Sequence, residues 1–193
     1  MARPIQYDRN AVLEKAMRAF WDKGYHATSM ADLIQVTNLR PGSLYAAFHS
    51  KEALFMETLD HYGSMGAAAL AKMLGEAESP LQGVKSLFIY LADEAADRDA
   101  LNSCFLVNTV LELARHNDTA HDRARHHLGI IEGILKDALE AAKSRGELRP
   151  ESDPAELAAF LICNIWGLRV LGGTSPSKER ARSVAKRIVS CLE

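Results

Sequence analysis

The chain has 193 residues, of which 48% are hydrophobic and 25% are charged, with a formal net charge of −2. This composition excludes an intrinsically disordered chain and supplies enough apolar surface for a buried core. The first residues lack the apolar run of a signal peptide, residues 160–171 form too short an apolar segment to span a membrane, and the three cysteines contain no CxxC pair. We therefore expect a reduced, cytoplasmic protein with no membrane partner.

Charge is distributed unevenly along the chain. Residues 1–51 contain seven basic and four acidic side chains, a balance of +3, so the remaining residues carry −5. A basic head on an acidic body indicates local contact with a polyanion. A solvated surface of uneven charge explains the same pattern equally well.

Apolar residues recur at helical spacing through nearly the whole chain, without an alternating strand pattern. The first predicted helix carries one apolar stripe and ends at Gly24, a typical helix-ending residue. The second begins at Ser29, which forms a capping-box pattern with Asp32 three residues later. It ends near Asn38, because asparagine tolerates the left-handed conformation that closes a helix.

A third and very short helix is predicted from Pro41 to about Phe48. Proline suits the first turn, where its missing N–H would have no partner inside the helix. Leu44 and Phe48 are spaced to face inward, so Tyr45 should point outward. Two short helices with a tight link, braced by a preceding amphipathic helix, match a helix-turn-helix at about residues 29–48. The second helix of that motif enters the major groove of DNA.

Six more helices are predicted after this motif, so the expected fold is all-α with about nine helices. Five of them have the approximate ranges 51–74, 104–114, 119–143, 154–171 and 177–192, and the remaining one begins at Ser79-Pro80.

Residues 28–55 read TSMADLIQVTNLRPGSLYAAFHSKEALF. This stretch resembles the DNA-binding signature of the tetracycline-repressor (TetR/AcrR) family of bacterial regulators. The sequence differs from the family pattern at Asn38, where asparagine is tolerated, and at Arg40 and Ala47. Because Arg40 and Ala47 stand at base-reading or phosphate-reading positions, the resemblance does not give the operator sequence.

The resemblance implies a particular domain organisation. It predicts a helix-turn-helix DNA-binding domain over residues 6–66 and a C-terminal helical bundle over residues 67–193. The bundle would form both a ligand cavity and a dimer interface.

The resemblance also implies which residues contact DNA. The expected DNA-binding residues are Thr28, Arg40, Pro41, Gly42, Ser43, Tyr45, Ala46, His49 and Lys51. Residues 40–43 and Ala46 would face the groove, and the others would contact the phosphate backbone. Arg3 is a candidate arm for the minor groove, with a disordered terminus as the alternative.

The last two predicted helices each carry an apolar stripe, which indicates burial against a second copy of the chain. The expected interface residues are Leu157, Phe160, Leu161, Ile165, Leu168, Leu171, Ala181, Val184, Ala185, Ile188 and Leu192. Packing within one chain is the alternative. A dimer would place two recognition helices about 34–36 Å apart, matching successive major grooves of a palindrome.

By resemblance, the body would also bind an unknown small-molecule effector. The candidate lining residues are Phe88, Cys104, Phe105, Asn108, Glu112, Leu128, Ile131, Cys163 and Trp166, with plain core packing as the alternative. Cys104 opens a predicted helix, where a thiolate is favoured, so it is either a reactive sensor or an inert buried residue.

No cofactor or metal is expected. Asp118, Asp122 and His126 share a helix face but form no dense ligand motif. No HExxH or GxSxG signature points to an enzyme.

The predicted function is a DNA-binding transcriptional regulator. We expect a homodimeric repressor that binds a palindromic operator in double-stranded DNA and is released by a small molecule. One alternative is a DNA-binding dimer without small-molecule input, either an activator or a partner-controlled protein. A helical enzyme ranks below both.

Overall fold

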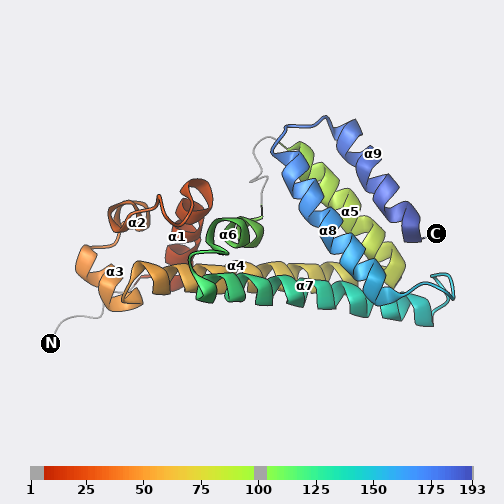
Figure 1. Cartoon of the computed structure of the whole chain (residues 1–193), viewed down its shortest axis with the longest axis horizontal. Helices are drawn as coiled ribbons and strands as arrows, with labels where there is room; N and C mark the ends of the chain where they lie inside the picture. The colour runs from red at the N-terminus through yellow and green to blue at the C-terminus, as the bar shows by residue number, and fades with distance from the viewer. Residues whose placement is uncertain (1–6, 98–103, 193) are drawn as a thin grey trace. The chain divides into compact units, whose positions relative to one another are not determined.

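The computed structural model describes residues 7–97 and 104–192. Within these ranges the chain forms nine α-helices and one short 3-10 helix, with no strand (Figure 1). The predicted all-α fold is therefore confirmed.

The described residues divide into two compact units. The first holds those within Met1–Met65 and Phe105–His127, and the second those within Gly66–Cys104 and Leu128–Glu193. Helices α4 and α7 each contribute residues to both units. Residues 105–127 thus pack with the N-terminal helices, although they follow the predicted domain boundary at residue 66.

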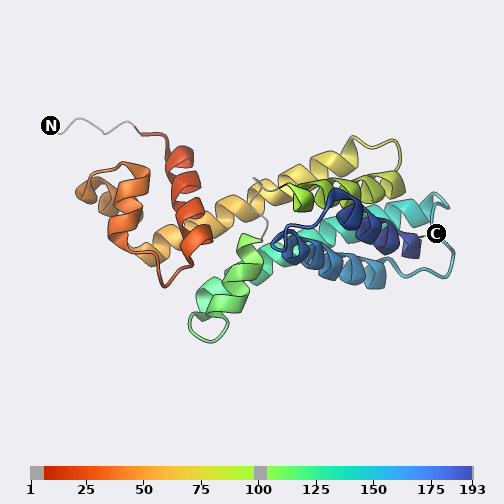
Figure 2. The ribbon, with the colours of Figure 1, turned by 90° about the horizontal axis from the view of Figure 1, so that it is seen from above.

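The first unit is built from short helices and the N-terminal parts of two long ones. Its helices are α1 (Arg9–Lys23), α2 (Met30–Thr37), α3 (Pro41–Phe48), α6 (Phe105–Leu113) and the first parts of α4 (Lys51–Gly75) and α7 (Asp118–Ser144). Figure 2 shows α1, α2 and α3 gathered around the beginning of α4. Phe20, Leu33, Leu44, Phe48 and Phe55 are all at most 2% exposed, so each of the three N-terminal helices and α4 contributes buried side chains to this unit.

The ends of the first helices follow the sequence signals. The carboxylate of Asp8 accepts hydrogen bonds from the first backbone N–H groups of α1, and Gly24 ends this helix at φ +82°. The capping box between Ser29 and Asp32 is present at the start of α2. Asn38 closes α2 in the left-handed conformation at φ 61°. The predicted helix-turn-helix is therefore confirmed down to its caps.

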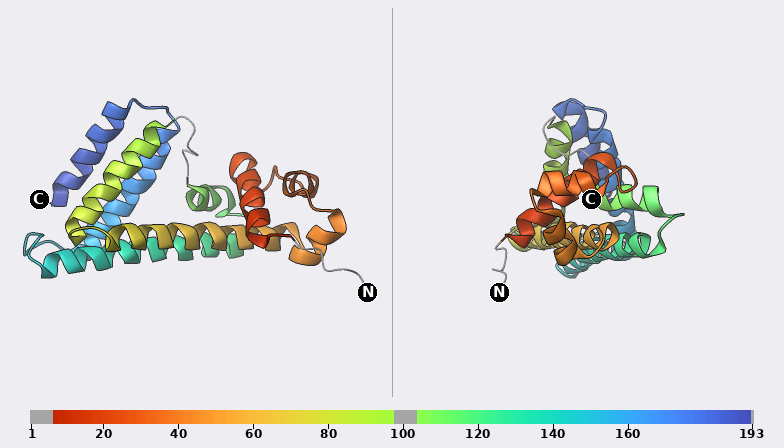
Figure 3. Two further views of the ribbon diagram at one scale, coloured as in Figure 1. Left: turned by 180° about the vertical axis from the view of Figure 1, so that it is seen from behind. Right: turned by 90° about the vertical axis from the view of Figure 1, so that its left-hand side faces the viewer.

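The second unit is a helical bundle. It contains α5 (Pro80–Ala96), α8 (Pro154–Gly172), α9 (Lys178–Val189), the 3-10 helix Ser190–Leu192 and the C-terminal parts of α4 and α7. Helix α5 packs against both α8 and α9, and these three helices lie side by side in Figure 3. The core includes Phe88, Leu91, Leu135, Leu161 and Ile162.

Two carboxylates of α5 hold α8 and α9 from the surface. Asp93 accepts two hydrogen bonds of 2.7 Å from the guanidinium of Arg182 in α9. This pairing lowers the pKa of Asp93 below its ordinary value. Glu94, the next residue, pairs with Arg169 of α8 at 2.8 Å. Adjacent acidic residues on one helix thus reach two different neighbours.

Helix α8 is longer than its most apolar segment suggested. Among the described residues it is the helix whose length and mean hydropathy of 1.4 would allow it, by length and composition alone, to cross a membrane. Helix α8 nevertheless packs against α5 and α9. Only 28% of its apolar window is buried within the chain, so much of an apolar helix is left uncovered.

Candidate nucleic-acid interface

Helix α3 has one side anchored in the first unit and one side open. Leu44 is fully buried and Phe48 is 2% exposed, whereas Tyr45 is 47% exposed. Pro41 occupies the first turn, and the preceding Arg40 has extended backbone. The predicted outward orientation of the Tyr45 phenol is therefore confirmed.

The open side of α3 carries the residues predicted to face a groove. Arg40, Pro41, Gly42 and Ala46 are exposed, and Ser43 is half-buried. A side chain at Gly42 would meet nothing within 4 Å, and no positive φ requires glycine at this position. Glycine is a poorer helix former than alanine, and packing within the chain gives no reason for glycine at this position. Close approach of another molecule would supply that reason.

Thr28 lies before α2 and is fully buried. Its hydroxyl donates hydrogen bonds to the carbonyl oxygens of Gly24 at 2.7 Å and Ala19 at 3.3 Å. The side chain of Thr28 therefore stabilises the end of α1. With none of its surface exposed, Thr28 presents no group to a phosphate in this structure.

Lys51 and His49 lie at the junction of α3 and α4. The Lys51 ammonium sits 4.3 Å from the centre of the Tyr25 ring, a cation–π contact that holds it beside the start of α4. Burial, followed by the charge of Glu52, raises the pKa of Tyr25 above its ordinary value. His49 is exposed and has φ 64°. A cation at a helix N-terminus suits an anionic ligand.

Arg9 is an important residue that sequence reasoning missed. Its guanidinium lies 4.4 Å from the centre of the Phe48 ring, and its Nη2 donates to both carboxylate oxygens of Glu57 at 2.6–2.7 Å. Arg9 thereby ties α1 to the end of α3 and to α4. The partners are 39 and 48 positions away in the sequence, so no local pattern indicates them. Arg3 lies outside the described residues.

The candidate effector residues fall in both units. Phe105, Asn108 and Glu112 line a cleft of about 460 Å³ in the first unit, beside Phe20 and Trp21. The others belong to the second unit, as divided above. There Phe88 is fully buried and Cys163 is exposed, while Cys104, Leu128, Ile131 and Trp166 are partly buried.

Six of the residues predicted for a dimer interface are instead core residues of the second unit. They are Leu161, Leu168, Ala181, Ala185, Ile188 and Leu192, each at most 5% exposed. The physical reason is that α5 packs against α8 and α9 and covers the inner side of both helices. Of the other five, Phe160 and Val184 are exposed, and Leu157, Ile165 and Leu171 are partly buried.

A second polar network joins α4 to α7 within the first unit. Asp60 accepts a hydrogen bond from Arg123, and its other oxygen lies 2.8 Å from Nε2 of the buried His127. Burial alone would raise the pKa of Asp60, but the bonds to His127 and Arg123 outweigh burial and lower it. Among the residues that the structure describes, no group of three or more His, Cys, Asp or Glu is arranged to hold a metal ion.

The two short helices, the outward phenol and the open helix side together define a helix-turn-helix protein. Residues 12–58 match the family described as "Bacterial regulatory proteins, tetR family", and residues 80–185 match "Tetracyclin repressor-like, C-terminal domain". The chain belongs to the tetR family, and it is a DNA-binding transcriptional regulator.

Individual relatives and solved structures agree with this placement. The chain is 33% identical to the HTH-type transcriptional repressor ComR of Escherichia coli (strain K12), over 95% of this chain and 88% of ComR. It is 31% identical to the repressor BdcR of the same organism, over 70% of this chain and 67% of BdcR. A cysteine mutant of the TetR family regulator CifR, complexed with 26-bp operator DNA, superposes with a TM-score of 0.88 at 29% identity, covering 99% of this chain and 100% of that one.

Proposed function

We propose that the protein is a cytoplasmic, homodimeric repressor that binds a palindromic operator in double-stranded DNA. The open side of α3 carries this proposal, because it presents Arg40 and Tyr45 outward beside the uncovered backbone of Gly42. A slender helix of this kind fits the major groove, where base edges can be read. The similarity to ComR, named as a repressor, and to CifR, solved with operator DNA, supports the same function.

The proposed dimer uses the outer side of α8 together with α9. Phe160, Cys163, Gly167 and Val170 recur at helical spacing on α8, and all four are exposed. Phe160 is 46% and Val170 is 68% exposed, so the stripe is apolar and open along much of its length. A second copy would cover it and would place two α3 helices around a two-fold axis.

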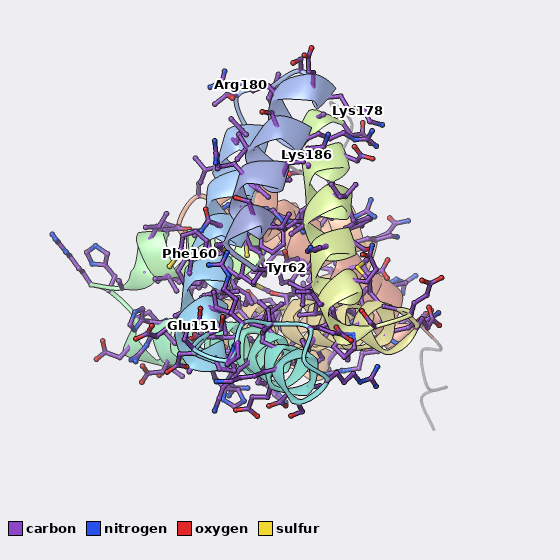
Figure 4. All side chains as sticks on the ribbon, turned by 90° about the vertical axis from the view of Figure 1, so that its right-hand side faces the viewer. Tyr62, Glu151, Phe160, Lys178, Arg180 and Lys186 are labelled. Atoms are coloured by element: carbon purple, nitrogen blue, oxygen red, sulfur yellow. The ribbon has the colours of Figure 1, made fainter. Side chains whose placement is uncertain are left out.

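The charges of α9 suit the edge of such an interface. Figure 4 shows Phe160 on α8 and Lys178, Arg180 and Lys186 along α9. Arg180 and Lys186 are exposed. An apolar centre with a charged rim is the usual composition of a protein–protein interface. This arrangement supports α8 as the centre of the contact and α9 as its rim.

We also propose that a small molecule releases the protein from its operator. A ligand that binds one arrangement of the dimer better than another shifts the population between them. The alternative is a dimer controlled without a small molecule. Screening metabolites for those that both raise the melting temperature and release labelled operator would separate the two, because an effector must do both.

Selection of bound fragments from a random DNA pool tests the DNA-binding proposal. We expect enrichment of a palindrome with half-sites about 10 base pairs apart. The same selection with Arg40→Ala should lose preference at one base pair of each half-site if Arg40 reads a base, a loss of about 1–3 kcal/mol. An unenriched pool, or enrichment of a single unrepeated site, would contradict the palindromic operator.

A further inference from the structure

The side chain of Glu112, in α6, is bonded to the segment that connects α1 with α2. Its Oε2 accepts a hydrogen bond from the backbone N–H of Tyr25 at 3.0 Å, and its Oε1 accepts one from the backbone N–H of His26 at 2.9 Å. One carboxylate therefore binds two successive backbone N–H groups, using both of its oxygens. Hydrogen bonds to an ionised group are stronger than those between neutral groups.

The backbone before these two donors is shaped around the carboxylate. Gly24 has φ +82°, and a Cβ at this position would lie 3.0 Å from Oε2 of Glu112. Glycine is therefore required at residue 24 both for its conformation and for the space that Glu112 occupies. A further contact fixes the connection on its outer side, where Lys23 binds Asp32 of α2 at 2.7 Å. The Lys23 side chain is 51% exposed, so we expect this outer pair to contribute little.

Helix α6 is itself held in the first unit at its other end. The ring of Phe105 packs edge-on against Phe55 of α4, with centroids 5.7 Å apart, and against Tyr62 at 5.8 Å. Phe105 also lies 6.0 Å from the ring of Trp21 in α1. Because Phe105 and Glu112 are two turns apart, α6 spans from the aromatic core of this unit to the α1–α2 connection.

We propose that Glu112 is a positioning residue for operator binding. By fixing the connection before α2, its carboxylate sets the angle at which α2 and α3 leave α1, and hence how α3 meets a groove. The residue touches no DNA in this account; it acts through Tyr25 and His26. The inference rests on the proposed function as a dimer on a palindromic operator, because only paired half-sites make the orientation of α3 measurable as a preferred spacing.

The test compares Glu112→Ala and Glu112→Gln with Glu78→Gln, which removes an exposed carboxylate from the second unit. Affinity is measured for the operator selected by the wild-type protein and for versions with one base pair added or removed between half-sites. Hydrogen exchange at the amides of Tyr25 and His26 reports directly on the bonds. Melting temperature reports whether each variant is folded.

We expect Glu112→Ala to weaken operator binding about tenfold, the effect of losing roughly one good hydrogen bond. The difference in affinity between the operator with the native spacing and the operators with altered spacing should become smaller. The amides of Tyr25 and His26 should both exchange faster. The salt dependence of binding should keep its slope, because the phosphate contacts are unchanged. The operator affinity of Glu112→Gln should lie between those of Glu112→Ala and the wild-type protein, since its single amide oxygen can accept one of the two hydrogen bonds. Glu78→Gln should bind as the wild-type protein does.

Unchanged affinity and spacing preference in a folded Glu112→Ala protein with fast-exchanging amides would overturn the inference. So would weaker binding with a flatter salt slope, which would mean lost phosphate contacts, or weaker binding with both amides still protected. If Glu112→Ala unfolds, the Gln variant decides by the same criteria. Failure of the wild-type protein to bind any selected DNA would instead refute the proposed function itself, and the positioning role with it.

Discussion

The guanidinium of Arg9 lies over the ring of Phe48, 4.4 Å from its centre, and this contact joins the first helix to the end of the recognition helix α3. The same guanidinium pairs with Glu57 of α4. One cation thus braces three helices of the first unit. Both partners of the ion pair are more than one-third exposed, so we attribute most of the stabilisation to the contact with the ring.

Removing this brace should cost stability. Arg9→Ala should lower the free energy of unfolding by about 1 kcal/mol, the sum of a cation–π contact and a weak surface pair. Urea unfolding measures the change. Arg18→Ala provides the control, because it removes the same charge from an exposed position of α1. An equal loss of unfolding free energy in both variants would mean that the change in net charge, and not the contact with Phe48, causes the loss.

Lys51 and Tyr45 should contribute to DNA affinity without specifying sequence. Lys51→Ala should weaken binding to all duplexes and should reduce the slope of log affinity against log salt by about 1, because one fewer counterion is released. Tyr45→Phe should weaken binding but leave that slope unchanged, since the phenol is neutral. Fluorescence anisotropy at several salt concentrations measures both effects, with Lys136→Ala in the second unit as control. If both variants bind DNA with wild-type affinity, Lys51 and Tyr45 do not contribute to the DNA interface.

Two glycines of the same helix should respond oppositely to alanine. A Cβ at Gly63 would overlap the ring of His127, whereas a Cβ at Gly66 would meet nothing within 4 Å. Gly63→Ala should therefore cost about 1–3 kcal/mol of stability through forced repacking. Gly66→Ala should gain about 0.5–1 kcal/mol, because alanine suits a helix interior better. Thermal unfolding of both variants shows whether Gly63→Ala lowers the stability and Gly66→Ala raises it.

A double-mutant cycle identifies His127 as the cause. In the His127→Ala background, Gly63→Ala should cost much less than in the wild-type protein, because the ring that fills the space is gone. An equal cost in both backgrounds would show that another neighbour resists the added methyl group.

Local sequence signals at the helix ends are enough to predict the helix-turn-helix. The capping box of Ser29 and the left-handed Asn38 depend on residues within one turn, so a short pattern is enough to predict them. The contacts of Glu112 with Tyr25 and His26 join residues 86 and 87 positions apart, and no spacing rule predicts such pairs. For the same reason, the stripes on the last two helices indicated burial but could not show that α5 covers them.

The acid sensitivity of the protein should depend on Asp60. Bonds to His127 and Arg123 keep the pKa of Asp60 below its ordinary value of 3.8 in the folded protein. A lowered pKa contributes stability above the unfolded-state value, and this contribution is lost as pH falls through the folded-state value. Asp60→Asn should therefore destabilise the protein at neutral pH, with the difference from wild type shrinking below about pH 4.

Unfolding titrations at neutral and acid pH measure this difference. Asp137→Asn is the matched control, because Asp137 is exposed and lies on the same helix as His127. A gap between wild type and Asp60→Asn that stays constant from neutral to acid pH would show that ionisation of Asp60 does not stabilise the fold.

The outer side of α8 should hold the two subunits together. Phe160 is 46% exposed in the single chain and is the aromatic member of the open apolar stripe. Buried aromatic residues at interface centres often contribute about 2 kcal/mol or more, so Phe160→Glu should raise the dissociation constant of the dimer at least about 30-fold. Sedimentation equilibrium measures that constant. Leu111→Glu is the control, because Leu111 is 78% exposed and lies in the first unit.

A monomeric Phe160→Glu protein should still bind one half-site through α3. It should lose the higher affinity for the full palindrome, since that gain in affinity requires both copies to bind together. If the variant stays dimeric and keeps the advantage, the subunits must meet through a different surface.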